Sequence, residues 1–395
     1  MIVPKNSLPR WIGVAISFYA FIAIGIAEAG LGVLLPSILL EYNLNPATVT
    51  LLFVSQISGY ILAALTSSVV NSCLGLGKML FSAASMLTIA LVIYALSPTW
   101  LLMVAAGTLF GLGVGLIDAG INTAIAQDDR STNLIGLLHG FYGIGALSGA
   151  AIATTLLAIG MNWRQVYGVL AAIVSLLMMS VLAAIIYRYP SMTQGKASSH
   201  APAWQNLGQS LQTPLVWLTG LLLLIYVGLE ASISNWAYIV QIRDRQIPVL
   251  VAGYSISAYW LGLTVGRFIL GYFLRSLGAV KTISMSLILL MIGLLAWWQL
   301  PEQWISLPMI GFALAPIFPA TIWLIPKQLP ASLVPAAVSF ATSAASIGAA
   351  MIPSGVGWIA SWSGLSIIPV LMLPLAIAMI VLHWANSHHQ NLLET

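Results

Sequence analysis

Three acidic residues lie inside long apolar segments of this chain, where a carboxyl group is costly. Glu28, Asp118 and Glu230 stand among runs of aliphatic residues and glycine, although only 6% of the residues are charged. A carboxyl at the middle of a bilayer costs a few kcal/mol on insertion scales, so an acid there marks a functional site by default. We expect all three acids to take part in proton coupling. For Glu28 the alternative is a helix-packing acid bonded to a nearby hydroxyl.

An amide follows one of these acids at helical spacing. Asn122 comes four residues after Asp118, which places both side chains on one helix face. A carboxyl and an amide there can share donors and acceptors with a ligand hydroxyl. The alternative is an Asp-Asn hydrogen bond between helices that holds a bundle together.

The segment after Glu230 is too polar and aromatic for contact with lipid. Asn235, Trp236 and Gln241 follow it, and they are candidates for binding a solute. The alternative is a wide, solvent-filled end of the span. Trp236 and Trp260 lie deep within their segments, where a ring either stacks on a solute or packs in the protein.

One base and one histidine also lie within apolar segments. Arg267 needs a partner or a water-filled face, and we expect it to act as a gate on the cytoplasmic side or to contact the solute. Histidine titrates near neutral pH, so His139 is a candidate for relaying protons and for binding the solute; the alternative is a packed hydrogen-bond donor.

The elements that must position these residues are membrane helices. The chain of 395 residues is 60% hydrophobic, and its mean hydropathy is +1.01. Apolar runs of about 20 residues recur throughout, and they are too long for barrel strands. We therefore predict an all-α membrane protein with twelve transmembrane helices. The expected spans are residues 11 to 40, 48 to 70, 78 to 97, 100 to 126, 133 to 160, 163 to 188, 213 to 240, 249 to 274, 280 to 299, 303 to 326, 332 to 360 and 364 to 386.

A long polar connector divides these spans six and six. We expect an N-terminal six-helix bundle at 1–188, a cytoplasmic linker at 189–212 and a C-terminal six-helix bundle at 213–395. The halves also read as a weak repeat, which is typical of transporters with a site between two bundles. The matching pairs, 202 or 203 residues apart, are Glu28 with Glu230, Pro46 with Pro248, Gly59 with Gly262, Gly75 with Gly278 and Lys78 with Lys281.

The basic residues predict the orientation. With both termini in the cytoplasm, nine of the thirteen Lys and Arg residues lie inside and three outside, as the positive-inside rule favours. We expect a multi-pass protein of the plasma (inner) membrane with no cleavable signal peptide. This topology explains the net charge, so a nucleic-acid partner is not expected.

Several classes of chemistry lack their sequence signatures. The single cysteine excludes a disulfide framework. There is no phosphate-binding glycine loop, no zinc pattern and no serine-base pair. We therefore predict that the protein is not an enzyme, has no cofactor or metal, and acts as a monomer in the bilayer.

One loop pattern resembles the major facilitator superfamily. Gly262-Leu-Thr-Val-Gly266-Arg267, followed by Arg275-Ser-Leu-Gly278-Ala-Val-Lys281, is similar to the family's signature between the second and third helices of a half. The N-terminal copy, 71–78, is degenerate, with Asn71 where the family usually has aspartate. The resemblance covers nearly the whole chain and implies the major facilitator fold.

A narrower resemblance is to the fucose/galactose/hexose symporter branch and its uncharacterised relatives. It rests on the segments 111–122 and 138–146, which contain Asp118, Asn122 and His139. The resemblance implies that Glu28 and Asp118 serve proton coupling. The chain departs from the fucose pattern at Tyr142, which stands in place of a sugar-binding asparagine, and at Asp118, which stands in place of glutamate. Tyr142 is therefore a candidate solute contact, and the substrate does not carry over.

These observations predict a secondary active transporter that works by alternating access. We expect proton-coupled symport of a small polar organic solute such as a sugar. The alternatives are a proton-driven exporter of amphipathic compounds and a uniporter without ion coupling. A membrane enzyme or lipid-handling protein would need a nucleophile or metal cluster, which the sequence does not show.

Overall fold

The computed structural model describes residues 11–126, 131–187, 207–300 and 303–394, and these residues form helices joined by short turns. Twelve of the helical segments among them are long and apolar enough to cross a membrane. Helices satisfy every backbone hydrogen bond within one segment, which a chain in hydrocarbon requires. The prediction of an all-α protein with twelve transmembrane helices is confirmed.

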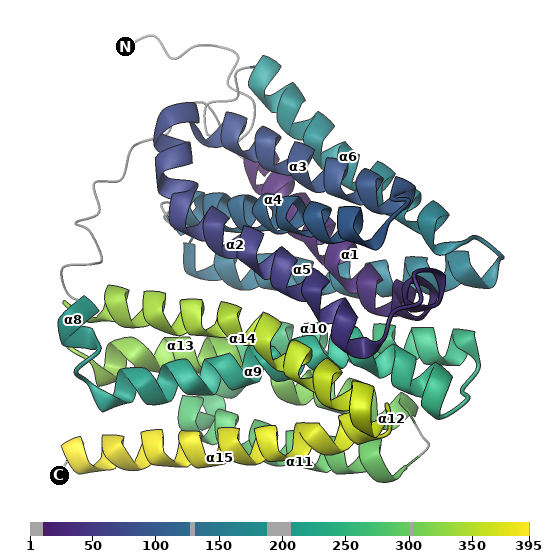
Figure 1. Cartoon of the computed structure of the whole chain (residues 1–395). Helices are drawn as coiled ribbons and strands as arrows, with labels where there is room; N and C mark the ends of the chain where they lie inside the picture. The colour runs from purple at the N-terminus through teal and green to yellow at the C-terminus, as the bar shows by residue number, and fades with distance from the viewer. Residues whose placement is uncertain (1–10, 127–130, 188–206, 301–302, 395) are drawn as a thin grey trace, which may run out of the picture. The chain divides into compact units, whose positions relative to one another are not determined.

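The helices of the N-terminal half run side by side over most of their length (Figure 1). Their bounds differ by only a few residues from the predicted spans. They are α1 (Trp11–Glu41), α2 (Pro46–Leu74), α3 (Leu76–Leu96), α4 (Trp100–Ala126), α5 (Ser131–Ala158) and α6 (Trp163–Ile186).

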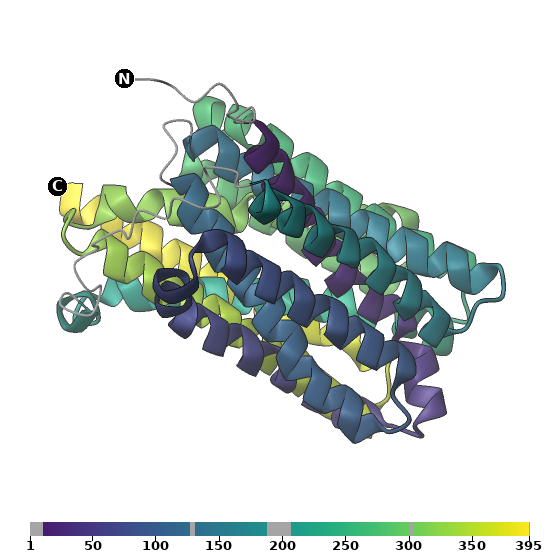
Figure 2. The same cartoon turned by 90° about the horizontal axis from the view of Figure 1, so that it is seen from above.

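The C-terminal half repeats this arrangement, with one span in two pieces (Figures 1 and 2). The tenth span breaks between α12 and α13 at Pro316, as expected for a residue that cannot donate a backbone hydrogen bond. The elements are α8 (Leu207–Ser210), α9 (Pro214–Ile239), the π-helix η2 (Val240–Asp244), α10 (Val249–Leu277), α11 (Ala279–Gln299), α12 (Gln303–Leu314), α13 (Ile317–Gln328), α14 (Val334–Ser363) and α15 (Ile367–Glu394).

The chain groups into two compact units. The first unit comprises Met1–Leu34 and Ser55–Ser198, and the second comprises Leu35–Val54 and Ser199–Thr395. The joined ends of α1 and α2 therefore group with the second unit. The predicted linker at 189–212 lies mostly outside the described residues.

Glycines bring pairs of helices into backbone contact inside the first unit. A Cβ on Gly59 of α2 would collide with the carbonyl oxygen of Thr108 on α4, and one on Gly111 would collide with that of Gln56. Small residues permit this close approach between membrane helices. This packing holds the part of α2 around Gly59 against α4.

The second unit contains the same packing 200 to 203 residues later. A Cβ on Gly262 of α10 would meet the carbonyl of Pro308 on α12, and one on Gly311 would meet that of Tyr259. The turn glycines agree as well, because Gly75 and Gly278 have φ of 77° and 75°. The repeat inferred from scattered sequence matches is therefore a repeat of helix packing.

Candidate functional site

The carboxylate of Asp118 lies at the centre of a polar cluster in the first unit. Its Oδ2 accepts a hydrogen bond of 2.6 Å from the hydroxyl of Tyr60 on α2. Its Oδ1 accepts one of 2.7 Å from Nδ2 of Asn122, which also donates to the Asp118 backbone carbonyl at 3.0 Å. Both carboxyl oxygens are thus engaged by side chains that can donate a hydrogen bond.

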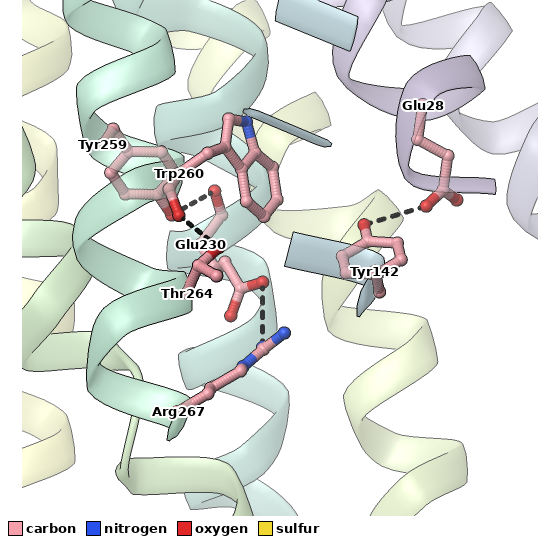
Figure 3. Close-up of polar contacts among 7 residues, drawn as sticks. All are labelled: Glu28, Tyr142, Glu230, Tyr259, Trp260, Thr264 and Arg267. Atoms are coloured by element: carbon pink, nitrogen blue, oxygen red, sulfur yellow. Dashed lines mark hydrogen bonds and ion pairs between the residues drawn. The ribbon is translucent and has the colours of Figure 1, made fainter. Parts of the chain in front are cut away.

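Glu28 on α1 joins this cluster from the other side. Its Oε2 accepts a 2.9 Å hydrogen bond from the hydroxyl of Tyr142 on α5 (Figure 3). Glu28 is also close enough to Tyr60 for an electrostatic interaction. Asp118 and Glu28 therefore both act on Tyr60, the first through a hydrogen bond and the second through its charge, and helices α1, α2, α4 and α5 each contribute to this region.

Tyr60 is the residue of this cluster that sequence reasoning missed. It follows Gly59, so the close contact of α2 with α4 carries its hydroxyl to Asp118. Its polar tip within the apolar segment 48–70 was the available signal. A separation of 58 residues from Asp118 left its partner undetermined.

The second unit holds an ion pair between two of the predicted residues. Nη2 of Arg267 on α10 lies 3.6 Å from Oε1 of Glu230 on α9, and the side chains are only 14% and 13% exposed (Figure 3). The partner that a base within a span requires is thus Glu230. Each charge stabilises the other in this poorly solvated place, and removal of either would leave the other uncompensated.

Two buried tyrosines adjoin this ion pair. The hydroxyl of Tyr259 donates to the backbone carbonyl of Glu230 at 3.3 Å (Figure 3). The hydroxyl of Tyr226, one turn before Glu230 on α9, lies close to both Glu230 and Arg267, although it makes no geometrically ideal hydrogen bond among the described residues. Neither tyrosine was predicted from the sequence.

The acids occupy the same place in each half. In the first unit Gly145 of α5 packs on the Ile22 carbonyl, six residues before Glu28. In the second unit Gly348 of α14 packs on the Leu224 carbonyl, six residues before Glu230. The equivalence of the two glutamates, inferred from an offset of 202, thus has a structural basis within each unit.

Trp236 and Gln241, two of the predicted solute contacts, are both buried. Trp236 is fully buried, its Nε1 donates to the Pro353 carbonyl at 3.0 Å, and its ring packs edge-on against Phe53. Gln241 is also fully buried, in η2, where its Oε1 accepts a 2.8 Å hydrogen bond from Ser255. In this conformation Trp236 follows the packing alternative, whereas Nε2 of Gln241 has no hydrogen-bond partner among the described residues.

Three other predicted solute contacts are His139, Trp260 and Asn235. His139 is partly exposed. His139 packs edge-on against Phe21, with ring centroids 5.7 Å apart. Trp260 is 3% exposed and lies edge-on to Tyr259, beside the ion pair in Figure 3. Asn235 is partly exposed on α9.

Comparison with known proteins identifies the family. The sequence pattern of the Major Facilitator Superfamily matches residues 17–306. The chain belongs to this superfamily. It is a multi-pass membrane transporter and not an enzyme, and the predicted resemblance is confirmed.

Relatives of this superfamily member align over most of its length. It is 24% identical to "Bypass of stop codon protein 6" of Saccharomyces cerevisiae, over 92% of this chain and 80% of the relative. It is 22% identical to the "Glucose/mannose transporter GlcP" of Bacillus subtilis, over 86% and 85%.

Solved structures of the superfamily share its fold. A mutant form of the nucleoside transporter NupG superposes with a TM-score of 0.77 at 14% identity, over 95% of this chain and 99% of that structure. The D-xylose-proton symporter superposes with a TM-score of 0.71 at 14% identity, over 93% and 97%. At these identities the likeness concerns the fold alone.

Proposed function

We propose that this superfamily member is a proton-coupled symporter of a neutral, hydroxyl-rich solute such as a sugar. The observation that carries the proposal is the Tyr60 hydroxyl, which donates to Asp118 and interacts electrostatically with Glu28. A hydroxyl that bonds one acid and lies near a second offers a route for a proton within a span. The relative named as a glucose/mannose transporter and the fold neighbour named as a D-xylose-proton symporter support the same class.

Protonation of Asp118 would reorganise the cluster. A neutral carboxyl gains a donor, so the hydrogen bond with Tyr60 can reverse its direction. The Tyr60 hydroxyl would then be free to donate toward Glu28, which already accepts from Tyr142. Proton loading at one acid would thereby alter the hydrogen bonding of the other, and this change is the coupling step that we propose.

The charges within the spans favour a neutral solute. Arg267 is the base that the sequence places within a span, and Glu230 balances it. An anionic solute would have to compete with Glu230 for that base. A polyol would instead use amide and phenol groups as partners, and we propose Asn122, Tyr142, His139, Asn235 and Trp260 for this role.

The ion pair suits a gate better than it suits proton loading. A guanidinium beside Glu230 can hold α9 and α10 together in one state and release them in another. We therefore propose that Arg267 and Glu230 open and close during alternating access, in a plasma membrane protein whose termini are both cytoplasmic.

Asp118→Asn tests the proposal in proteoliposomes. The amide keeps the size of the side chain but removes the titratable proton, so accumulation of a labelled sugar driven by a pH gradient should be lost. Counterflow exchange of the same sugar, which needs no net proton movement, should persist in part. The matched control is Asp244→Asn, which changes an exposed acid of η2 and should accumulate like the parent.

The opposite outcome would remove the coupling role. If Asp118→Asn accumulates sugar as the parent does, Asp118 is a packing residue and a uniporter becomes the better hypothesis. A first screen by thermal shift against sugars and nucleosides would choose the labelled solute, because a ligand that binds the native state stabilises it.

A further inference from the structure

A groove between α11 and α15 lies in the second unit, apart from the acids and tyrosines of the candidate site. Its volume is about 230 Å³, and side chains of only these two helices line it. Neither helix contributes a residue to the polar clusters described above. The groove therefore needs an explanation of its own.

One end of the groove is polar. Oγ of Ser284 and Nε2 of His383 are 2.9 Å apart, and the Oγ of Ser387 donates to the backbone carbonyl of His383 at 2.9 Å. His383 is buried, with only 6% of its surface exposed. The hydrogen-bonded imidazole and two hydroxyls form a polar end to the groove.

The rest of the groove is apolar and open to the outside of the helix pair. Ile288 and Ile380 form its walls, and Ile288 is 59% exposed. Trp384 is 66% exposed and stacks face to face on His388, with centroids 5.5 Å apart. An apolar body with a polar end matches the shape of an amphiphile.

A basic residue, Lys281, follows the polar end of the groove along α11. Lys281 is exposed and lies three residues before Ser284 and seven before Ile288, so it falls on the same stripe of α11 as these lining residues. No acidic side chain is among the described residues that line the groove. The charge at this end therefore favours a negatively charged group.

The groove is open, so its surroundings fill it. Water would number about eight molecules at liquid density. Mostly apolar walls offer such waters few hydrogen bonds, whereas lipid tails are as apolar as these walls. We propose that the groove between α11 and α15 binds one anionic phospholipid, with its headgroup at Lys281, Ser284 and His383 and an acyl chain along Ile288 and Ile380.

The first unit provides a matched control. Lys78 of α3 lies 203 residues before Lys281 and is also exposed, but Phe81 occupies the position equivalent to Ser284. The first unit thus has the lysine without the small polar residue behind it. A general attraction of lipid to surface lysines would affect Lys78 and Lys281 alike.

Native mass spectrometry of the full-length protein tests the site. Protein in mild detergent is titrated with phosphatidylglycerol or with phosphatidylcholine of the same acyl chains. We expect the parent to retain one phosphatidylglycerol in preference to phosphatidylcholine. Lys281→Gln should weaken phosphatidylglycerol retention about fivefold, as one lysine charge contributes near an anionic lipid. Ser284→Phe should fill the groove and remove both lipids, and Lys78→Gln should match the parent.

Three outcomes would overturn the proposal. Retention of phosphatidylglycerol by both Lys281→Gln and Ser284→Phe at the parent's level would show that the groove is not the site. Equal loss in Lys78→Gln would show that surface charge alone holds the lipid. Equal retention of the two lipids by the parent would overturn the assignment of an anionic headgroup. Lys281→Gln changes an exposed side chain, so its result does not depend on tolerance of a buried substitution.

Discussion

Removal of one hydroxyl group, in Tyr60→Phe, probes the proposed link between the two acids of the first unit. The substitution keeps the ring between α2 and α4 and deletes only the donor that lies 2.6 Å from Oδ2 of Asp118. Asn122 would still donate to the other oxygen. The ionised carboxylate would therefore lose one of its two side-chain donors, whereas the protonated form would lose a weaker hydrogen bond between neutral groups.

The size of the effect follows from the strength of that hydrogen bond. A hydrogen bond to a charged group contributes roughly 1.5 to 3 kcal/mol, and about 1.4 kcal/mol corresponds to a tenfold change in an equilibrium constant. A hydrogen bond between neutral groups contributes about 1 kcal/mol, so loss of the Tyr60 hydroxyl should favour the protonated acid by about 0.5 to 2 kcal/mol, or about 2- to 30-fold. The half-maximal pH of proton-dependent uptake should then rise by about 0.4 to 1.5 pH units.

Initial uptake rates in proteoliposomes, measured from pH 5 to 9 at a constant gradient, would show this change. Tyr94→Phe is the matched control, because the Tyr94 hydroxyl lies in the same unit and accepts its hydrogen bond from an amide, that of Gln56, at 3.2 Å. The control should keep the parent's pH profile. Both variants should give the parent's far-ultraviolet circular dichroism.

Two results would refute the reasoning. An unchanged pH profile in Tyr60→Phe would mean that the protonation of Asp118 does not govern uptake. A shift toward lower pH would mean that the hydroxyl stabilises the neutral acid rather than the charged one, which reverses the sense of the proposed relay.

The remaining predictions concern packing and the gate. Gly311→Ala should destabilise the protein by about 1 to 3 kcal/mol and lower its melting temperature, because the added methyl group would collide with a backbone carbonyl of α10. Gly168→Ala is the control and should leave the melting temperature unchanged, since the space around Gly168 is open. Glu230→Ala and Arg267→Ala should each destabilise the protein more than the double variant does, since each single change leaves an uncompensated charge; a double variant that melts at the sum of the two losses would contradict the pairing. Trp236→Ala should cost roughly 3 to 5 kcal/mol while leaving solute affinity in the folded fraction unchanged, and a weakened affinity by isothermal titration calorimetry would restore its predicted stacking role.

The membrane helices were predictable because hydropathy is a local property. The first span was expected at 11–40 and is Trp11–Glu41, and the fourth was expected at 100–126 and is Trp100–Ala126. The scattered glycine matches were also informative, since a glycine that permits backbone contact must recur wherever the contact recurs. Gly59 and Gly262 therefore revealed the repeat before any helix was placed.

The partners of the buried charges were decided only by the tertiary structure. Helical periodicity places Asp118 and Asn122 on one face, and that pairing is present. It does not say which helix lies opposite, so neither Tyr60 beside Asp118 nor Arg267 beside Glu230 followed from spacing. Such pairs depend on which helices pack and at what depth.

The packing of Trp236 also could not be predicted from the sequence, because its partners lie on distant segments. A ring that follows Glu230 in sequence can face a cavity or a neighbouring helix, and composition cannot distinguish the two. Packing against Phe53 and the Pro353 carbonyl removes Trp236 from any cavity in this conformation. The sequence by itself determined the number, length and repeat of the helices, which depend on the transfer of side chains from water to lipid. Only the tertiary structure decided which side chains meet, because contacts between distant segments arise from the packing of whole helices.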